Sequence, residues 1–191
     1  EASWFERRPL YGKRIVVTRG RAQAGRWSGM LAEAGADVLE IPLIEARKGG
    51  DPRVVSEILA GLGTYEWIVF TSANGVRFFF QYFFRAFRDI RAFGGMRIAA
   101  IGAGTAREVA RYHLEVDLLP EESVAESLAD ALIETGDLAS AAVLVVTGNR
   151  NRDVLPRKLE EAGEAIVDTL QVYETVKTDV SENCDWLRFR E

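Results

Sequence analysis

The sequence predicts an α/β protein built on parallel sheets, because apolar strands alternate with helices of roughly ten residues. Within this alternation, a buried strand repeatedly runs into a small polar turn and then a helix. This happens in IVVTR (residues 15–19), WIVFTSAN (67–74), IAAIGAGT (98–105) and VLVVTGN (143–149). In open α/β sheets this carboxyl edge binds ligands, and the following helix offers free N–H groups to an anion. The sequence therefore predicts a protein that holds an anionic molecule.

The first elements along the chain form a short unit. Residues 14–18 and 38–41 are predicted strands on either side of a helix over residues 23–34, and Gly35 is placed to end that helix. The Asp51-Pro52 pair predicts a second helix start, with Asp as the N-cap and Pro at the first helical position. Two strands cannot form a sheet covered on both faces, so we expect a later segment to complete this first domain.

The remaining elements form a longer series, sufficient for one complete three-layer domain. Ser123 and Glu126 have the spacing of a capping box for one of its helices. After residue 175 the pattern weakens. The predicted strands cover residues 67–70, 97–101, 116–118, 143–146 and 165–172; the predicted helices start at residue 52 and cover 75–87, 105–112, 124–134 and 153–161.

The composition narrows the class of protein. The net charge is −5, with acidic and basic residues interspersed, which argues against nucleic acid as the main partner but leaves room for a local basic pocket. The single cysteine, Cys184, and the single histidine, His113, provide neither a disulfide nor a metal site. The longest apolar runs are only strand-sized, so we expect a cytoplasmic protein with no membrane partner and no cofactor.

Six segments that follow one another in order resemble the uroporphyrinogen-III synthase family, and the resemblance extends over residues 10–177. The opening SWFERRPLYGKR also resembles the junction in bacterial fusions of a uroporphyrinogen-III methyltransferase to this synthase. The six segments are GKRIVVTR (12–19), AGADVLEIPLIE (34–45), YEWIVFTSANGVRFFF (65–80), IAAIGAGTA (98–106), RDVLPRKLEEAG (152–163) and LQVYETV (170–176).

The resemblance implies two flavodoxin-like α/β domains with parallel sheets, joined by a two-stranded connector made of residues 42–47 and 172–177. Family members continue well beyond the VYETV segment. We therefore expect a C-terminal truncation that leaves the first domain incomplete, with residues 185–191 (DWLRFRE) at best a degraded counterpart of a missing strand. The implied division is a tail or linker (residues 1–11), a discontinuous first domain (12–46 and 173–191) and a second domain (47–172).

The family's reaction is implied with the fold. It cyclises hydroxymethylbilane, a linear tetrapyrrole polycarboxylate, to uroporphyrinogen III, with inversion of ring D and loss of water. The product feeds siroheme, cobalamin or haem synthesis. Implied protein partners are hydroxymethylbilane synthase and a fused methyltransferase. Two other interpretations stay open: a non-catalytic tetrapyrrole-binding or docking fragment of a synthase, and a nucleotide-binding protein.

Tyr173, in QVYETV, matches the family's cleft tyrosine, which implies that it donates a proton or hydrogen bond to the leaving hydroxyl. From the residues alone, an ordinary tyrosine on an amphipathic strand is the competing interpretation. The aromatic run of residues 78–80, 83, 84 and 87 predicts a helix packed in the core, with a partner surface as the alternative.

The substrate-binding candidates come from the four strand-to-helix turns. Helix capping competes with ligand binding at Ser72 and Asn74, and a solvated side chain competes with carboxylate binding at Arg19. In GAGT the third glycine of a dinucleotide fingerprint is replaced by Arg107, which argues against a nucleotide. The candidates are Thr18, Arg19, Thr71, Ser72, Asn74, Gly102, Thr105, Thr147 and Asn149.

Overall fold

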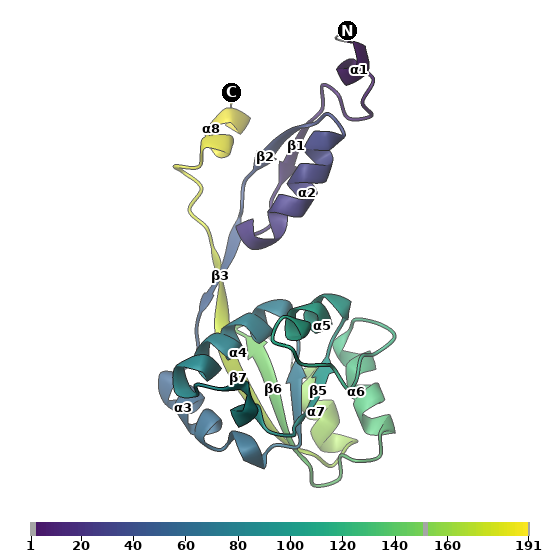
Figure 1. Ribbon diagram of the computed structural model, residues 1–191, viewed down its shortest axis with the longest axis vertical. Helices are drawn as coiled ribbons and strands as arrows, with labels where there is room; N and C mark the ends of the chain where they lie inside the picture. Colours follow the sequence, from purple (N-terminus) through teal and green to yellow (C-terminus); the bar gives the residue numbers. More distant parts are fainter. Residues whose placement is uncertain (1–2, 151–152, 191) are drawn as a thin grey trace. The chain divides into compact units, whose positions relative to one another are not determined.

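The computed structural model describes residues 3–150 and 153–190 (Figure 1). The contacts between residues divide the chain into two compact units. Unit 1 comprises Glu1–Arg47 with Thr175–Glu191, and unit 2 comprises Lys48–Glu174. The fold is mixed α/β with parallel strand pairing in both units, as the sequence predicts.

Unit 2 is built on a parallel sheet. β4 (Trp67–Phe70) pairs in parallel with β5 (Arg97–Ala100) on one side and with β6 (Ala142–Gly148) on the other, and β6 pairs in parallel with β7 (Ile166–Lys177). The whole sheet has the order β3-β7-β6-β4-β5, with β3 (Ile44–Lys48) at one edge. Because the four parallel strands stand in the chain order 2-1-3-4, unit 2 has a flavodoxin-like topology whose direction switches between β4 and β6.

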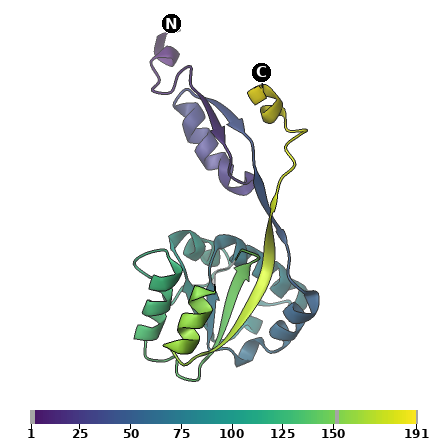
Figure 2. The same cartoon turned by 180° about the vertical axis from the view of Figure 1, so that it is seen from behind.

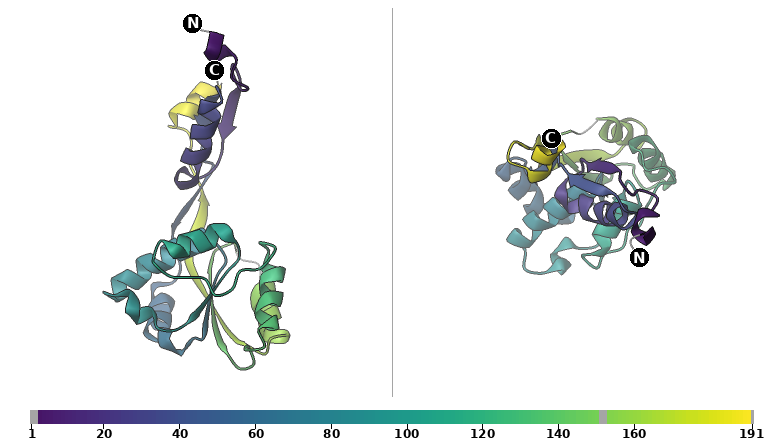
Figure 3. Two further views of the ribbon diagram at one scale, coloured as in Figure 1. Left: turned by 45° about the vertical axis from the view of Figure 1, so that its right-hand side comes forward. Right: turned by 90° about the horizontal axis from the view of Figure 1, so that it is seen from above.

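Helices cover both faces of this sheet, as Figures 1 and 2 show from opposite sides and Figure 3 from the side. No helix among the described residues is long and apolar enough to cross a membrane. One face carries α3 (Pro52–Ala60), α4 (Ala73–Ala86) and α5 (Ala103–Ala110), with the 3₁₀ helices η1 (Leu62–Thr64) and η2 (Ile90–Phe93); the other face carries α6 (Ala125–Glu134) and α7 (Val154–Glu161).

The central strands are buried on both faces, and their alternating side chains supply two separate cores. Ile68 and Phe70 of β4 face α3, α4 and α5, whereas Trp67 and Val69 face α6 and α7. The prediction that the aromatic run is packed in the core is confirmed for Phe79, Phe80 and Phe83, whose side chains are fully buried in the first core, but not for Phe84, which is 45% exposed.

Unit 1 contains a two-stranded parallel sheet, with β1 (Arg14–Val17) paired to β2 (Asp37–Glu40). The helix between the strands is α2 (Arg21–Glu33), and it ends as predicted at Gly35, whose φ of +99° is the left-handed conformation that favours glycine. The buried apolar side chains of this unit are few among the described residues: Val17, Ala24, Leu39 and Ile41. The short helix α1 (Ser3–Glu6) lies near its start.

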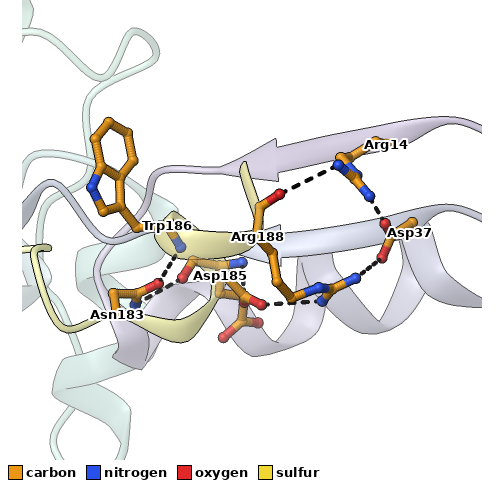
Figure 4. A network of polar contacts seen from close by, with 7 residues as sticks. Arg14, Asp37, Asn183, Asp185, Trp186 and Arg188 are labelled. Atoms are coloured by element: carbon orange, nitrogen blue, oxygen red, sulfur yellow. Dashed lines mark hydrogen bonds and ion pairs between the residues drawn. The ribbon is translucent and has the colours of Figure 1, made fainter. Parts of the chain in front are cut away.

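A C-terminal helix, α8 (Cys184–Arg190), is attached to β2 by polar side chains (Figure 4). Asp185 accepts a hydrogen bond from the backbone N–H of Glu40 at 2.7 Å, and Asn183 donates to the carbonyl of Glu40 at 3.2 Å. Arg188 pairs with Asp37 at 2.8 Å. Side chains thus occupy backbone groups that a further strand would use on the edge of β2.

β3 and β7 are neighbours in the larger sheet and run antiparallel. The N–H of Gly49 donates to Val172 at 3.1 Å, and the N–H of Thr178 donates to Leu43 at 3.0 Å. The two bonds join residues in opposite chain order, which only antiparallel strands allow.

Three predicted details are wrong. Ser123 does not cap α6: the N-cap is Val124, one residue later, and no side chain supplies a capping bond. Residues 116–118 contribute only a bridge between Leu118 and Ala99 rather than a strand. Residues 184–190 are a helix and not a degraded strand, because Asn183 caps the first turn by accepting from the N–H of Trp186.

Candidate functional site

The carboxyl ends of four parallel strands meet at one edge of unit 2. Because the topology switches between β4 and β6, this edge is where open α/β sheets bind ligands. The structure brings eight of the ten predicted site residues into unit 2, at or just beyond these strand ends: Thr71, Ser72 and Asn74 after β4, Gly102 and Thr105 after β5, Thr147 and Asn149 at the end of β6, and Tyr173 in β7.

A hydrogen bond between Ser72 and Tyr173 lies at the centre of this edge. The two hydroxyl oxygens are 3.1 Å apart, and either can be the donor. Ser72 is also the N-cap of α4, as predicted, and its oxygen accepts from the N–H of Gly75 at 2.9 Å. Capping and a contact to the tyrosine therefore coexist at one side chain.

The ring of Tyr173 contacts two neighbours. It stacks on Phe78 with ring centroids 5.8 Å apart and an angle of 17° between the planes. It also lies against Gly148, where an added Cβ would come within 2.4 Å of the ring carbon that bears the hydroxyl. The backbone carbonyl of Tyr173 accepts from the N–H of Asn149 at 3.1 Å, which ties the tyrosine to the end of β6.

The predicted threonines are less available than Ser72. The hydroxyl of Thr71 donates to the carbonyl of Val146 at 3.0 Å, so its proton is used within the sheet edge. Thr105 and Thr147 are only 5% and 4% exposed. Burial leaves little of these two hydroxyls for a ligand, and the geometry favours the serine and the tyrosine as the groups that present protons.

Arg77 is a cationic residue that the sequence analysis did not single out. It lies one turn into α4 and donates to the side-chain oxygen of Asn74, which orients both side chains at the start of this helix. It also borders a hollow of about 370 Å³ between α4 and α5, lined by Arg77, Gln81, Glu108, Arg111 and Tyr112. The available signal was its spacing from Asn74 in FTSANGVR, since residues three apart share a helix face.

Charges around this hollow act on Tyr112. Burial raises the pKa of the Tyr112 phenol and Glu108 raises it further, while Arg111 and Arg77 oppose the shift. Tyr112 is therefore neutral at physiological pH. Glu108 forms an ion pair with Arg111 at 3.5 Å, so the charge of Arg77 leaves the hollow net positive on a protein whose net charge is negative.

Ser123, predicted to cap α6, has a different position in the structure. Its side chain lies over Gly102, where an added Cβ would be 2.4 Å from the serine oxygen. This hydroxyl makes no capping bond to α6 and instead lies beside Gly102, between the end of β5 and the start of α5. Gly102, the first glycine of GAGT, thus admits a neighbouring chain segment.

Thr18 and Arg19 belong to unit 1 and follow β1. The carbonyl of Thr18 accepts from the N–H of Leu43 at 3.4 Å. Arg19 borders a hollow of about 210 Å³ that also contains two carboxylates, and these reduce its attraction for an anion; the lining residues are Arg19, Ala24, Glu40, Pro42, Asn183 and Asp185.

The fold and the edge of unit 2 define a class of protein: an α/β protein with parallel sheets, in which the hydroxyl groups of Ser72 and Tyr173 meet at a topological switch point. The family model described as uroporphyrinogen-III synthase HemD matches residues 25–190. The chain therefore belongs to the uroporphyrinogen-III synthase family, as the resemblance implied.

Individual relatives agree with this family. The chain is 30% identical to the uroporphyrinogen-III synthase of Synechococcus elongatus over 87% of this chain and 62% of the relative. It is 32% identical to the porphyrin biosynthesis protein HemD of Ruminiclostridium josui over 62% of this chain and 24% of that protein. A crystal structure of a mutant uroporphyrinogen III synthase from Thermus thermophilus has the same fold, with a TM-score of 0.64 at 18% identity over 87% of this chain and 64% of that one. The chain thus spans less than two thirds of these relatives.

Proposed function

We propose that this chain carries out the uroporphyrinogen-III synthase reaction: cyclisation of hydroxymethylbilane to uroporphyrinogen III, with inversion of ring D and loss of water. Family membership supports the proposal, and the observation that carries it is the Ser72–Tyr173 pair at the switch point of unit 2. No cofactor is required, because the pyrrole nitrogen lone pairs of the substrate drive the chemistry.

In this proposal the reaction begins at the terminal hydroxymethyl group. The Tyr173 hydroxyl donates its proton to the leaving oxygen, the C–O bond breaks, and a nitrogen lone pair forms the azafulvene. Tyr173 regains a proton from the N–H that the substrate loses, so the step releases one water and leaves the phenol unchanged. The substituted position of ring D then attacks the azafulvene, which gives a spiro intermediate. Fragmentation of this intermediate allows the macrocycle to close with ring D inverted.

Binding of the substrate carboxylates is assigned to the sheet edge. The free N–H groups at the start of α4 and the guanidinium of Arg77 are suited to carboxylates. The further candidates are Thr18, Arg19, Thr71, Asn74, Gly102, Thr105, Thr147 and Asn149. We also propose the two-domain arrangement. A discontinuous flavodoxin-like domain of residues 12–46 and 173–191, which is incomplete, is joined by β3 and the end of β7 to a second flavodoxin-like domain of residues 47–172.

The proposed protein partners are hydroxymethylbilane synthase, as the source of an unstable substrate, and a fused methyltransferase. A cytoplasmic location fits both. The alternative is that the chain binds tetrapyrroles without converting them, because it spans only 62% of the Synechococcus synthase.

A coupled assay tests the reaction. Hydroxymethylbilane is generated by its own synthase, the chain is added, and the oxidised uroporphyrin isomers are separated by chromatography. We expect the type III isomer in excess, whereas spontaneous closure gives type I. Type I alone would refute catalysis by this chain and favour the binding alternative.

Tyr173→Phe is the first variant for this assay. Because general acid catalysis contributes about 100-fold at the low end of its range and the leaving group is already good, we expect type III formation to slow by roughly that factor without vanishing. Tyr65→Phe is the matched control. The hydroxyl of Tyr65 donates a hydrogen bond to Asp168 near the amino ends of the strands, away from Tyr173. An equal loss in both variants would contradict the role of Tyr173.

A further inference from the structure

The backbone at Tyr173 departs from a regular strand. In the pairing of β6 with β7, Thr147 lies opposite Gln171 but Gly148 lies opposite Tyr173, so Val172 is an extra residue. A regular strand alternates its side chains, which would place Val172 and Tyr173 on opposite faces. Instead, Val172 is buried in the core beneath α3, α4 and α5, and Tyr173 packs against that same core. The bulge thus aims Tyr173 towards α4, where Ser72 and Phe78 lie.

The bulge alone would not make room for the ring. Gly148, the residue opposite Tyr173, has no side chain, and the ring lies across its Cα: the three ring carbons nearest to an added Cβ would be 2.4–2.8 Å away. Real Cβ atoms essentially never make contacts this short, and the ring is also stacked on Phe78. We therefore expect a side chain at position 148 to displace the phenol from Ser72.

Ser72 then determines how the phenol proton is used. Its oxygen already accepts from the N–H of Gly75, which occupies one of its acceptor sites and leaves its own O–H to donate to the phenol oxygen. When Ser72 donates to the oxygen of Tyr173, the tyrosine proton is left to point at a ligand. In the reverse arrangement the tyrosine hydroxyl would donate its hydrogen bond to Ser72 and not to a ligand.

We propose that Ser72 and Gly148 are positioning residues for Tyr173: Gly148 admits the bulged ring, and Ser72 donates to the phenol oxygen so that its proton faces the substrate. The chemical use of that proton rests on the proposed function. The positioning itself does not, and it can be measured without turnover.

The structural test is an NMR measurement on the full chain labelled with [ζ-¹³C]tyrosine, in which Tyr173→Phe assigns the signal. We expect the Tyr173 signal to move in Gly148→Ala and in Ser72→Ala, and to stay near its wild-type position in Ser72→Thr, which keeps the hydroxyl. Gly63→Ala is the matched glycine control, because an added Cβ there meets nothing within 4 Å. An unmoved Tyr173 signal in Gly148→Ala would overturn the positioning role; if that variant does not fold, the Ser72→Ala and Ser72→Thr pair decides.

The kinetic test is a double-mutant cycle with Ser72→Asp and Tyr173→Phe. Aspartate keeps the helix cap but can only accept hydrogen bonds, so the Tyr173 hydroxyl donates to its carboxylate instead of to a ligand. We expect each single variant to slow type III formation about 100-fold, mostly in kcat, and the double variant to be no slower than either. Multiplying effects would overturn the inference. A wild-type chain that gives only type I product while the NMR pattern holds would refute the proposed function and leave the positioning intact.

Discussion

The two units of this chain are stabilised by different interactions. In unit 2 the strands are buried on both faces, and two apolar cores surround them. In unit 1 the described residues include only a few buried apolar side chains, and α8 is held by exposed ion pairs and by partly buried hydrogen bonds. The comparison shows that one chain of this fold class can combine a rigid apolar scaffold with a unit that depends on solvent-exposed polar contacts.

This difference suits the chemistry that we propose for the edge of unit 2. A proton donor must be held within a few tenths of an ångström of its working position, which requires rigid supporting elements. The aromatic packing of α4 supplies such support, since Phe78 stacks on Tyr173 while its neighbours Phe79 and Phe80 are fully buried. Unit 1 has no comparable set of buried aromatic side chains among its described residues.

The largest expected effect is in the apolar core of unit 2. Phe80→Ala removes a ring that is fully buried and stacked 4.1 Å from Tyr112, so we expect the free energy of unfolding to fall by about 3–5 kcal/mol. Urea denaturation measures it. Phe84→Ala, on the same helix but 45% exposed, is the control and should cost well under half as much. Equal losses would break the contrast between core and surface.

A core substitution in unit 1 tests whether that unit opens independently. Leu39 of β2 is fully buried, and Leu39→Ala should destabilise unit 1 by about 2–3 kcal/mol, at the lower end of the usual range because few apolar neighbours surround it. Amide hydrogen exchange should then speed up in β1, α2 and β2 but not in β4 or β6. The control is Leu43→Ala, which is 47% exposed. Faster exchange throughout both units would show that they unfold together.

Removing the ion pairs of α8 should have a smaller effect. Arg188 pairs with Asp37 at 2.8 Å and with Asp185 at 3.3 Å, and all three side chains are partly solvated. Arg188→Gln should raise amide exchange in α8 by about fivefold at most, because exposed pairs contribute little. Arg190→Gln on the same helix is the control, and high salt should reduce the difference between the two variants. A larger effect that persists in salt would mean that packing, not charge, holds α8.

The smallest effect concerns pH. Hydrogen bonds from Arg188 and then Arg14 lower the pKa of Asp37 below its ordinary value of 3.8. A lowered pKa in the folded state means that the stabilisation is present above the ordinary value and is lost as pH falls through the folded one. The NMR shifts of α8 should therefore change below about pH 4, and this change should shrink in Arg188→Gln. An identical titration in both proteins would exclude this ion pair as the cause.

The fold could be predicted largely from local patterns. Asp51 caps α3 through the N–H of Arg53 at 2.8 Å, Ser72 caps α4, and Gly35 ends α2, each with the residue type that the geometry requires. The start of α6 was misjudged by one residue, since a serine before a helix can be at the N-cap or just outside it. The helix α8 has too short a sequence for periodicity to reveal, and it depends on contacts with β2.

The candidate site was less accessible from the sequence than the fold. Hydroxyl residues after strand ends indicated the edge, and Ser72 and Tyr173 were both named. Their direct contact was not predictable, because it depends on a bulge at Val172 that breaks the two-residue period and on a glycine that lies opposite only after folding. Thr105 and Thr147 looked equivalent to Ser72 in sequence, yet burial separates them.

The contacts at Glu40 have a consequence for self-association. An open strand edge is a template on which a second copy of a chain can add a strand, and growth in that direction leads to aggregates. Asp185 and Asn183 already occupy the N–H and the carbonyl of Glu40, so β2 presents a blocked position there to an incoming strand. A second copy could pair at this position only after displacing the two side chains of α8 and its preceding turn from β2.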